Sequence, residues 1–307
     1  METYSHNKRS RRASNSMVFI GILILVAMLL AACGSTTSTG GGSTPTANPA
    51  TPTIAAPSDL ITPGTLTVGS DTTYPPQEYI DTATGKAKGF DVDLITAIAQ
   101  RMGLQTNVVT DKFDTIFDDL VAKRFDVVIS AAFITPERQK KVDFVPYFKA
   151  GESLLVQTGN PSNIKSLADL CGQNAGVQAG TAEQDELKAA NEACVKASKP
   201  AINVTVLQDQ TAVVQLLANH RVVATYQDTP VTDYYNKQNP GQFSVGGVVV
   251  NYTTEGIAVR KGDTSMLNAI QTAFNQLKAD GTYHSVILKW GLNTGEISLL
   301  DRRTIVT

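Results

Sequence analysis

Cys33 is the residue with the clearest chemical role in this sequence. It ends a Leu-Ala-Ala-Cys segment at 30–33, which follows a basic cluster at 8–12 and an apolar stretch that begins at Met17. The apolar stretch falls short of the ~20 helical residues that span a bilayer comfortably. Small residues before a cysteine admit a signal peptidase, after which the thiol carries a diacylglycerol. We therefore predict a lipoprotein signal peptide over 1–32 and lipidation of Cys33, with an ordinary transmembrane anchor as the alternative.

Cys171 and Cys194 are the two cysteines that remain once Cys33 takes the lipid. An exported chain enters an oxidising compartment, where an even pair of cysteines favours a disulfide. Two free thiols, packed as small apolar groups, are the alternative.

The three histidines limit the other chemistry that this chain can perform. His6 falls in the predicted signal peptide, His220 directly follows the helix expected at 210–219, and His284 falls on the helix expected at 282–290, both away from the segments that carry the other chemistry. A nucleophilic triad or a histidine-rich metal site is therefore poorly supported. We predict no metal site and no cofactor.

Composition separates a linker from a folded part. Residues 33–60 are rich in Gly, Ser, Thr and Pro and carry almost no charge, which predicts a flexible linker. About 245 residues follow, enough for two small domains or one two-lobed unit. The formal net charge is −2 and no long basic run follows the signal, so we expect no nucleic-acid partner. No later apolar stretch could span a bilayer, which argues against a channel or a receptor with an internal kinase.

Strand and helix patterns alternate along the folded part. In its first half we expect strands at 66–69, 107–109 and 126–129, a loop at 70–79, and helices at 89–103 and 114–122. On the helix at 89–103, one face carries Leu94, Ile95, Ile98 and Met102. In the second half we expect strands at 175–178, 202–207, 222–226, 242–250 and 256–260. One expected helix begins at Thr181, with Gln184 three residues later at the spacing of a capping box. The other expected helices are at 210–219, 230–236, 264–279 and 282–290. This alternation predicts an α/β fold with mostly parallel sheets flanked by helices.

Short motifs in this chain resemble the family-3 extracellular solute-binding proteins. They include Gly-Phe-Asp-Val-Asp-Leu at 89–94, Thr-Pro-Glu-Arg at 135–138 and Asp-Gly-Thr-Tyr at 280–283. Further matching segments are 66–76, 125–130, 142–147, 177–181, 226–230 and 289–291. The resemblance implies a two-lobed type II periplasmic-binding fold with the ligand cleft between the lobes. It also implies that the first lobe contains 61–152 and 253–307, and that the second lobe contains 153–252.

The resemblance implies which groups hold a bound amino acid. Arg138 should bind the α-carboxylate, because a planar guanidinium gives two parallel charge-assisted hydrogen bonds. Asp228 matches the aspartate that accepts a hydrogen bond from the α-ammonium. The residues alone leave simpler roles open. Arg138 could pair at the surface with Glu137 or Asp143, and Asp228 could cap the helix that follows it.

Other matched positions complete this implied site. Thr181 and Ala182 match a helix N-terminus whose N–H groups face the carboxylate. Tyr74 and Phe113 match aromatic residues that sandwich the ligand side chain, and Ala131 matches a position whose carbonyl accepts from the ammonium. The side-chain end of the pocket is expected to be polar, with Asp71, Gln178 and Gln227.

Two positions depart from the family pattern. Phe133 stands where many relatives have Ser or Thr, so a hydroxyl contact to the ammonium is lost and the pocket gains an apolar wall. Gln77 stands where an aromatic residue often follows the Tyr-Pro-Pro segment. With its polar side-chain end, the implied pocket favours a polar or basic amino acid.

The function implied by the resemblance is capture of an extracellular amino acid and its delivery to an ABC permease. We expect a monomer that is held by lipid outside the cytoplasmic membrane. One alternative is a secreted enzyme of the same fold, similar to cyclohexadienyl or arogenate dehydratases, for which Glu78 and Glu183 are the cleft carboxylates. A ligand sensor for a membrane partner is the other alternative.

Overall fold

The structure of the chain is a computed structural model that describes residues 54–298. The predicted signal peptide, Cys33, the linker up to residue 53 and residues 299–307 lie outside the described residues. No helix within 54–298 combines the length and the apolar character that crossing a membrane requires.

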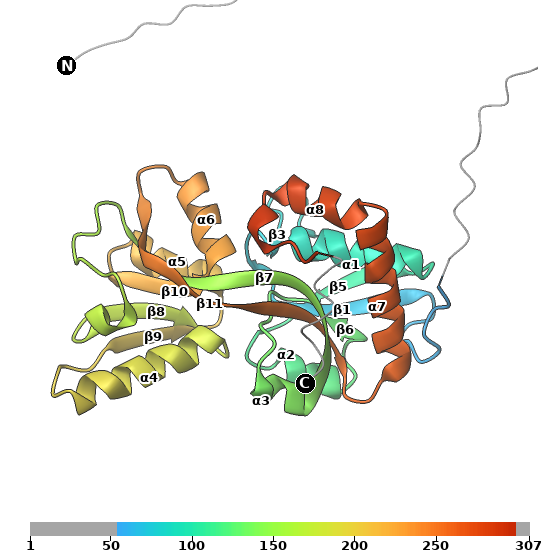
Figure 1. The fold of residues 1–307 in the computed structure, drawn as a ribbon, viewed down its shortest axis with the longest axis horizontal. Helices are drawn as coiled ribbons and strands as arrows, with labels where there is room; N and C mark the ends of the chain where they lie inside the picture. The colour runs from blue at the N-terminus through green and yellow to red at the C-terminus, as the bar shows by residue number, and fades with distance from the viewer. Residues whose placement is uncertain (1–53, 299–307) are drawn as a thin grey trace, which may run out of the picture. The chain divides into compact units, whose positions relative to one another are not determined.

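The described chain forms two groups of strands and helices that β7 and β11 connect (Figure 1). The first group begins with β1 (Thr65–Ser70), β2 (Thr73–Tyr74), β3 (Glu78–Ile80), β4 (Ala87–Lys88), α1 (Phe90–Arg101), β5 (Gln105–Thr110), α2 (Ile116–Val121), β6 (Val127–Val128) and α3 (Pro136–Lys141). After β7 (Val142–Gln157), the second group contains a 3-10 turn (Leu167–Leu170), β8 (Asn174–Gln178), α4 (Ala182–Lys196), β9 (Asn203–Leu207), α5 (Gln210–Ala218), β10 (Ala224–Asp228) and α6 (Thr229–Gln238). β11 (Phe243–Arg260) then returns to the first group, which ends with α7 (Thr264–Ala279), α8 (Thr282–Trp290) and a 3-10 turn (Asn293–Gly295).

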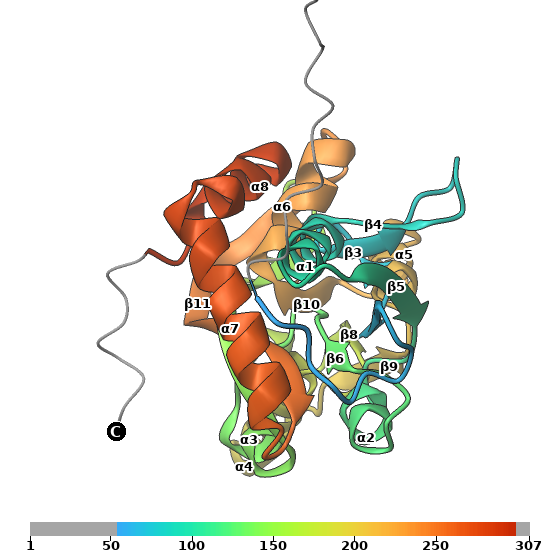
Figure 2. The same cartoon turned by 90° about the vertical axis from the view of Figure 1, so that its right-hand side faces the viewer.

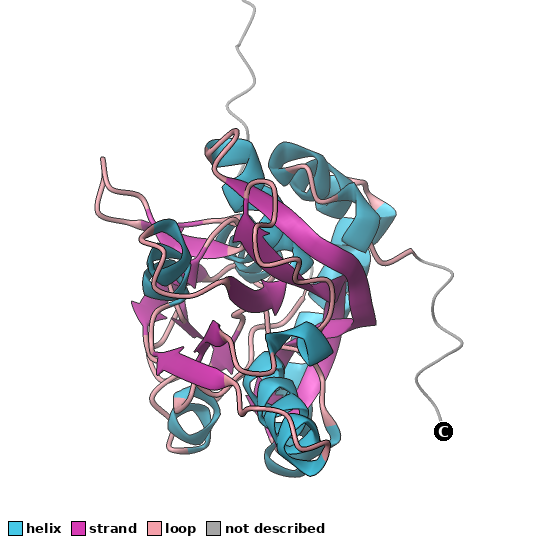
Figure 3. Cartoon of the chain, turned by 90° about the vertical axis from the view of Figure 1, so that its left-hand side faces the viewer, coloured by secondary structure: helices cyan, strands magenta, loops and turns pink. Residues whose placement is uncertain are grey.

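One eight-stranded sheet runs through both groups in the order β5-β1-β6-β11-β7-β10-β8-β9. The strands β5, β1 and β6 at one end are parallel, and so are β10, β8 and β9 at the other end. The middle strands β7 and β11 are antiparallel to each other and to their neighbours. Helices lie outside the strands (Figure 3). The predicted α/β class is confirmed, and an antiparallel pair joins its two parallel halves.

The connecting strands differ most from the predicted elements. β7 contains 16 residues and was not predicted, and β11 contains 18 residues where two strands were predicted at 242–250 and 256–260. The register of β11 against β7 shifts between Gly246 and Val250 and again before Thr253. Such irregularities interrupt the alternation of side chains on which strand prediction depends.

The segment predicted as a loop at 70–79 is also different. It contains β2 and β3, which form a small antiparallel sheet with β4. Strands of two or three residues and the six-residue helix α3 are too short to show a period in the sequence.

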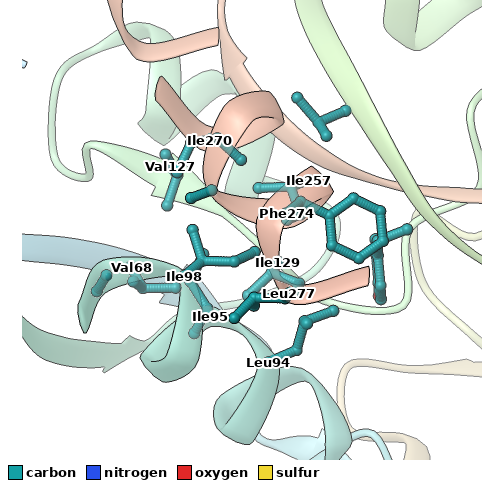
Figure 4. Packing of buried hydrophobic residues seen from close by; sticks show 14 of the residues in the cluster. Val68, Leu94, Ile95, Ile98, Val127, Ile129, Ile257, Ile270, Phe274 and Leu277 are labelled. Carbon is teal, nitrogen blue, oxygen red and sulfur yellow. The ribbon is translucent and has the colours of Figure 1, made fainter. Parts of the chain in front are cut away.

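Each group of elements has its own buried apolar cluster. In the first group, α1 packs against α7 and α8 (Figures 1 and 2). The buried side chains at their centre are Val68, Leu94, Ile95, Ile98, Val127, Ile129, Ile257, Ile270, Phe274 and Leu277, each at most 1% exposed (Figure 4). The inward face predicted for the first helix is thus confirmed. A separate cluster in the second group includes Leu154, Val177, Leu187 and Tyr226.

Cys171 and Cys194 form a disulfide with their Cα atoms 5.6 Å apart, as predicted. It ties the segment before β8 to the last turns of α4.

The two cysteines are 23 positions apart, so their bond closes a loop of that length and restricts the unfolded chain. Removing this disulfide should therefore lower the free energy of unfolding by about 3 kcal/mol. Urea denaturation of the Cys171→Ala, Cys194→Ala variant should show this loss, and a reductant should shift the wild-type protein by a similar amount but leave the variant unchanged. A variant as stable as the oxidised wild type would contradict this account.

Candidate functional site

A small cavity lies where the two groups of elements face each other. Its wall contains Asp71, Tyr74, Glu78, Phe113, Ser130, Ala131, Phe133, Arg138, Gln178, Thr181, Ala182, Glu183 and Asp228. The first eight residues belong to the first group of elements, and the last five belong to the second. Most follow the carboxyl ends of β1, β6, β8 and β10, which is where α/β sheets bind small molecules.

Arg138 is held at the start of α3. The hydroxyl of Thr135 caps this helix by accepting from the Arg138 backbone N–H at 3.2 Å. The guanidinium donates from Nη1 to the carbonyl of Phe133 at 2.7 Å and from Nη2 to the carbonyl of Gly180 at 3.2 Å. Burial lowers the pKa of Arg138, although nearby carboxylates oppose this shift. Arg138 therefore presents a partly buried charge to both groups of elements and is not the surface ion-pair partner of the simpler alternative.

Two phenylalanine rings fix the plane of this guanidinium. Its Cζ lies 5.0 Å from the ring centre of Phe113 and 5.2 Å from that of Phe117. Contacts of this kind suit the weakly hydrated guanidinium better than an ammonium group. Phe113 was predicted to contact the ligand, and here it lines the cavity while it packs against Arg138.

Asp228 and Glu183 form the acidic side of the same region. Asp228 ends β10 and its backbone N–H donates to the hydroxyl of Tyr74 at 3.2 Å, across the two groups. Burial and the neighbouring Glu183 raise the pKa of Asp228 well above its usual range. Burial also raises the pKa of Glu183. A cation entering here would therefore meet carboxyl groups that are shielded from water.

The N-terminus of α4 points its first turn at the cavity. Thr181 is the N-cap, and its Oγ1 accepts from the backbone N–H of Gln184 at 3.1 Å. Gln184 Oε1 in turn accepts from the Gly180 N–H at 2.7 Å, close to the predicted capping box. Thr181 and Ala182 both line the cavity, so a ligand carboxylate there would lie at the positive end of a 15-residue helix.

Asp71 and Gln178 meet across the cavity. Gln178 Nε2 donates to Asp71 Oδ2, and Thr73 Oγ1 donates to Asp71 Oδ1 at 2.8 Å. Burial raises the pKa of Asp71 to about 6, while these donors oppose the shift. Two of the three residues predicted for the side-chain end are thus brought together, with Asp71 from one group and Gln178 from the other.

Glu78 is a cavity residue that the predicted ligand set did not include. It is completely buried, and Ser130 Oγ donates to its Oε1 at 2.8 Å. It also shares a side-chain hydrogen bond with the buried Asp91. The sequence offered a weak signal, since Glu78 follows the matched Tyr-Pro-Pro segment, but it was considered only as a catalytic carboxylate. Ser130 and Glu183 are the other cavity residues that were not in that set.

The backbone at Ala131 has a strained conformation that buried hydrogen bonds hold in place. Ala131 has a φ of 45°, a conformation that an L-residue seldom adopts. Its N–H donates to Asp91 Oδ2 at 2.9 Å, and the hydroxyl of Tyr147 donates to the same oxygen at 2.7 Å. Buried contacts therefore orient this peptide at the cavity wall. Phe133 also lines the cavity, as the apolar wall that the sequence predicted.

Gln227 is the one predicted ligand residue that does not line the cavity. Its Oε1 accepts from Gln210 Nε2 at 3.3 Å, and its Nε2 donates to Thr232 Oγ1 at 2.6 Å. Side chains alternate along a strand, so Gln227 and Asp228 at the end of β10 point to opposite faces. Gln77, the other departure, donates from Nε2 to Glu255 at 2.5 Å behind the cavity.

Within 54–298, no group of three or more His, Cys, Asp or Glu side chains has an arrangement that could hold a metal ion.

The sequence and the fold both match known proteins. The model of the bacterial extracellular solute-binding proteins, family 3, matches residues 66–293. The L-cystine-binding protein TcyJ of Escherichia coli K12 is 32% identical over 228 residues, which cover 74% of this chain and 82% of TcyJ.

Solved structures support the same assignment. An ancestral arginine-binding protein bound to arginine is 39% identical, with a TM-score of 0.68 over 74% of this chain and 98% of that one. A structure described as an ancestral arginine-binding protein bound to glutamine is 38% identical, with a TM-score of 0.69 over 75% of this chain and 99% of that one. An ancestral amino acid-binding protein, described as a precursor of cyclohexadienyl dehydratase, is 35% identical, with a TM-score of 0.67 over 74% of this chain and 95% of that one. The chain belongs to the family-3 bacterial extracellular solute-binding proteins.

Proposed function

We propose that this protein captures a free amino acid in the cavity and delivers it to an ABC permease. The observation that carries the proposal is one buried cavity that contains Arg138 from the first group of elements and Asp228 from the second. An α-amino acid carries a carboxylate and an ammonium on the same carbon, and this pair of side chains offers the opposite charges. Neither group alone supplies both, so binding would favour the closed arrangement of the two.

The hinge of this movement is proposed at residues 150–153 and 250–253. There β11 changes register against β7, with Val250 paired to Glu152 and Thr253 paired to Ala150. These positions agree with the lobe boundaries inferred from the family, with a second lobe over 153–252. β7 and β11 run without a break between the two groups, so we expect each strand to bend slightly and the sheet to stay intact.

The ligand class is proposed to be a polar or basic amino acid. The cavity contains four carboxyl groups, Asp71, Glu78, Glu183 and Asp228, and one guanidinium. Glu78 adds to the cavity wall a carboxyl group that the predicted ligand set did not include. Relatives named for cystine and arginine, and ancestral structures with arginine or glutamine bound, agree with this class.

A thermal-shift screen over the free amino acids tests the function, with calorimetry on each ligand that stabilises the protein. A ligand at 100 times its Kd stabilises the folded state by about 2.7 kcal/mol. We expect arginine, lysine, glutamine or another polar amino acid to do this and the aliphatic amino acids to do so less. Binding of no amino acid would contradict the proposal.

The enzyme alternative rests on one structural relative described as a precursor of cyclohexadienyl dehydratase. Glu78 and Glu183 are the cavity carboxyl groups that such a reaction could use as an acid or base. We propose binding without catalysis, since the relative itself is described as an amino acid-binding protein. Incubation with prephenate-like acids followed by product analysis separates the two, because an enzyme forms the aromatic product faster than buffer alone does.

Family membership gives an extracellular or periplasmic protein, and we propose further that lipid on Cys33 anchors it to the membrane. The Cys33→Ser variant should remain unprocessed or leave the membrane fraction, because the serine cannot carry the diacylglycerol. Cell fractionation shows whether the variant leaves the membrane, and labelling with radioactive palmitate shows whether it carries lipid. Mature, unlabelled variant retained in the membrane fraction at the wild-type level would refute the anchor. A monomer is proposed as well, and scattering measures its mass directly.

A further inference from the structure

Three carboxyl groups form one hydrogen-bonded network in and behind the cavity wall. Asp91 on α1 shares a side-chain hydrogen bond with Glu78 on β3. The hydroxyl of Tyr147 on β7 lies 2.7 Å from Asp91 Oδ2 and 3.1 Å from Oε2 of Glu255 on β11. All three carboxyl groups are completely buried. Because a buried carboxyl group stays charged only where donors hold it so, the contacts in this network fix its protonation.

The contacts require two protons on the three carboxyl groups. Two carboxyl groups form a hydrogen bond only when one of them carries a proton, so Glu78 and Asp91 hold one between them. Tyr147 has a single hydroxyl hydrogen for two carboxyl partners, so one of these two contacts needs a further carboxyl proton. The network therefore keeps one negative charge.

Asp91 is the group that keeps this charge. As an anion it accepts from the Ala131 N–H at 2.9 Å, from Tyr147 and from Glu78. Each of the other two carboxyl groups would have two donors within the network in the same position. Asp91 also lies in the first turn of the 12-residue helix α1, whose positive end favours a carboxylate.

The pKa values agree with this assignment. Burial raises the pKa of Asp91 to about 7, while its hydrogen bonds with Ala131, Tyr147 and Glu78 oppose the shift. Burial, followed by the negative charge of Asp91, raises the pKa of Glu78 and the pKa of Glu255 well above the usual range. Glu78 and Glu255 are thus the groups that carry the two protons.

Ala131 connects the charge of Asp91 to the cavity. Ala131 lines the cavity with a φ of 45°, and its N–H donates to Asp91. The neighbouring Ser130 accepts from the Asp71 N–H at 2.9 Å and donates to Glu78 at 2.8 Å. The network therefore holds two segments of the cavity wall and places one negative charge directly behind the peptide at Ala131.

We propose that ionised Asp91 is a positioning residue of the amino-acid site, whose charge holds the peptide at Ala131 and favours a ligand with an α-ammonium group. The family resemblance predicts that the Ala131 carbonyl accepts from this ammonium. A negative charge behind the peptide attracts a cation in front of it, and the exclusion of water strengthens the attraction. The inference rests on the proposed amino-acid function and adds to that site a residue that does not line the cavity.

Calorimetry with pairs of ligands that differ only in the α-amino group tests the proposal. The pairs are arginine with 5-guanidinopentanoic acid and glutamine with 5-amino-5-oxopentanoic acid, each at about pH 8, where Asp91 is ionised. Asp91→Asn keeps the shape and removes the charge, so the amino acid should lose about 10-fold more affinity than its partner without the amino group. Glu255→Gln is the matched control, because an amide there replaces a buried group that is already neutral. Its affinity ratio should equal that of the wild type.

Neutron diffraction from crystals of the wild-type protein at the same pH locates the protons directly and remains decisive if a variant fails to fold. We expect deuterons on Glu78 and Glu255 and none on Asp91. A deuteron on Asp91 overturns the proposal.

The calorimetric outcomes separate this inference from the proposed function. Equal losses for both members of a pair in Asp91→Asn would show a purely structural role and overturn the proposal. An unchanged ratio in Asp91→Asn, or the same fall in Glu255→Gln, overturns it too, and each of these results leaves amino-acid binding intact. Binding of neither amino acid to the wild type means that the proposed ligand class has failed, and the deuteron positions then still decide whether Asp91 holds the charge.

Discussion

Replacing Arg138 with alanine should weaken amino-acid binding by about 2–5 kcal/mol, or roughly 30- to 5,000-fold in Kd. The substitution leaves the ligand carboxylate buried without its charge partner. It also removes the two hydrogen bonds that the guanidinium makes to the Phe133 and Gly180 carbonyls, one in each group of elements. Calorimetry with the ligand found in the screen measures the loss.

Two further variants identify the cause of this loss. Arg138→Lys keeps the charge but not the planar fork, so it should recover only part of the affinity. Arg124→Ala removes an exposed arginine that pairs with Asp119 at 2.9 Å and should bind as the wild type does. Near wild-type affinity in Arg138→Ala would reject the carboxylate-binding role, and denaturation curves show whether each variant is folded.

Local signals in the sequence predicted much of the chain because their physical cause is local. The capping pattern at Thr181 predicted the start of α4, and the apolar face of the helix at 89–103 predicted the side chains that α1 buries. Ten of the eleven ligand residues that the motif resemblance predicted line one cavity. Their roles in binding remain predictions until a ligand is tested.

Features that depend on distant partners could not be predicted in this way. β7 and β11 owe their length to pairing with each other across both groups of elements, which no short window of sequence records. Gln227 has the same chemistry as Gln178, and only the direction in which β10 presents its side chains places it away from the cavity. Glu78 was recognised as part of the cavity wall only when its burial beside Ser130 was visible.

The structure is closed over the cavity by contacts between the two groups. Gln208 Nε2 donates to Asp114 Oδ2 at 2.9 Å, and the backbone N–H of Gln210 donates to Thr73 Oγ1 at 3.1 Å. None of these four residues lines the cavity itself. A bound amino acid would stabilise the closed arrangement from inside the cavity, in addition to these contacts between the two groups.

Gly180 gives a way to prevent closure without changing any group that would touch the ligand side chain. It has a φ of +77°, and a Cβ added there would lie 2.5 Å from the Cα of Asp114 in the other group. Because Asp114 presents backbone at this point, the contact cannot be relieved by a change of rotamer. Gly262 has the same φ of +77° with no atom within 4 Å of an added Cβ, so it is a matched control.

Gly180→Ala should lose about 100-fold or more in affinity, since an incompletely closed site forfeits charge-assisted hydrogen bonds worth about 1.5–3 kcal/mol each. Both Gly180→Ala and Gly262→Ala should lose about 1–2 kcal/mol of folding stability, because alanine is strained in the left-handed conformation. Calorimetry should find the affinity loss in Gly180→Ala alone. Small-angle scattering should show the wild type and Gly262→Ala at the same radius of gyration with ligand, and Gly180→Ala at a larger one. Equal affinity and equal compaction in the two variants would mean that this contact between Gly180 and Asp114 does not form in the bound protein, and that the amino acid is held without the closure proposed here.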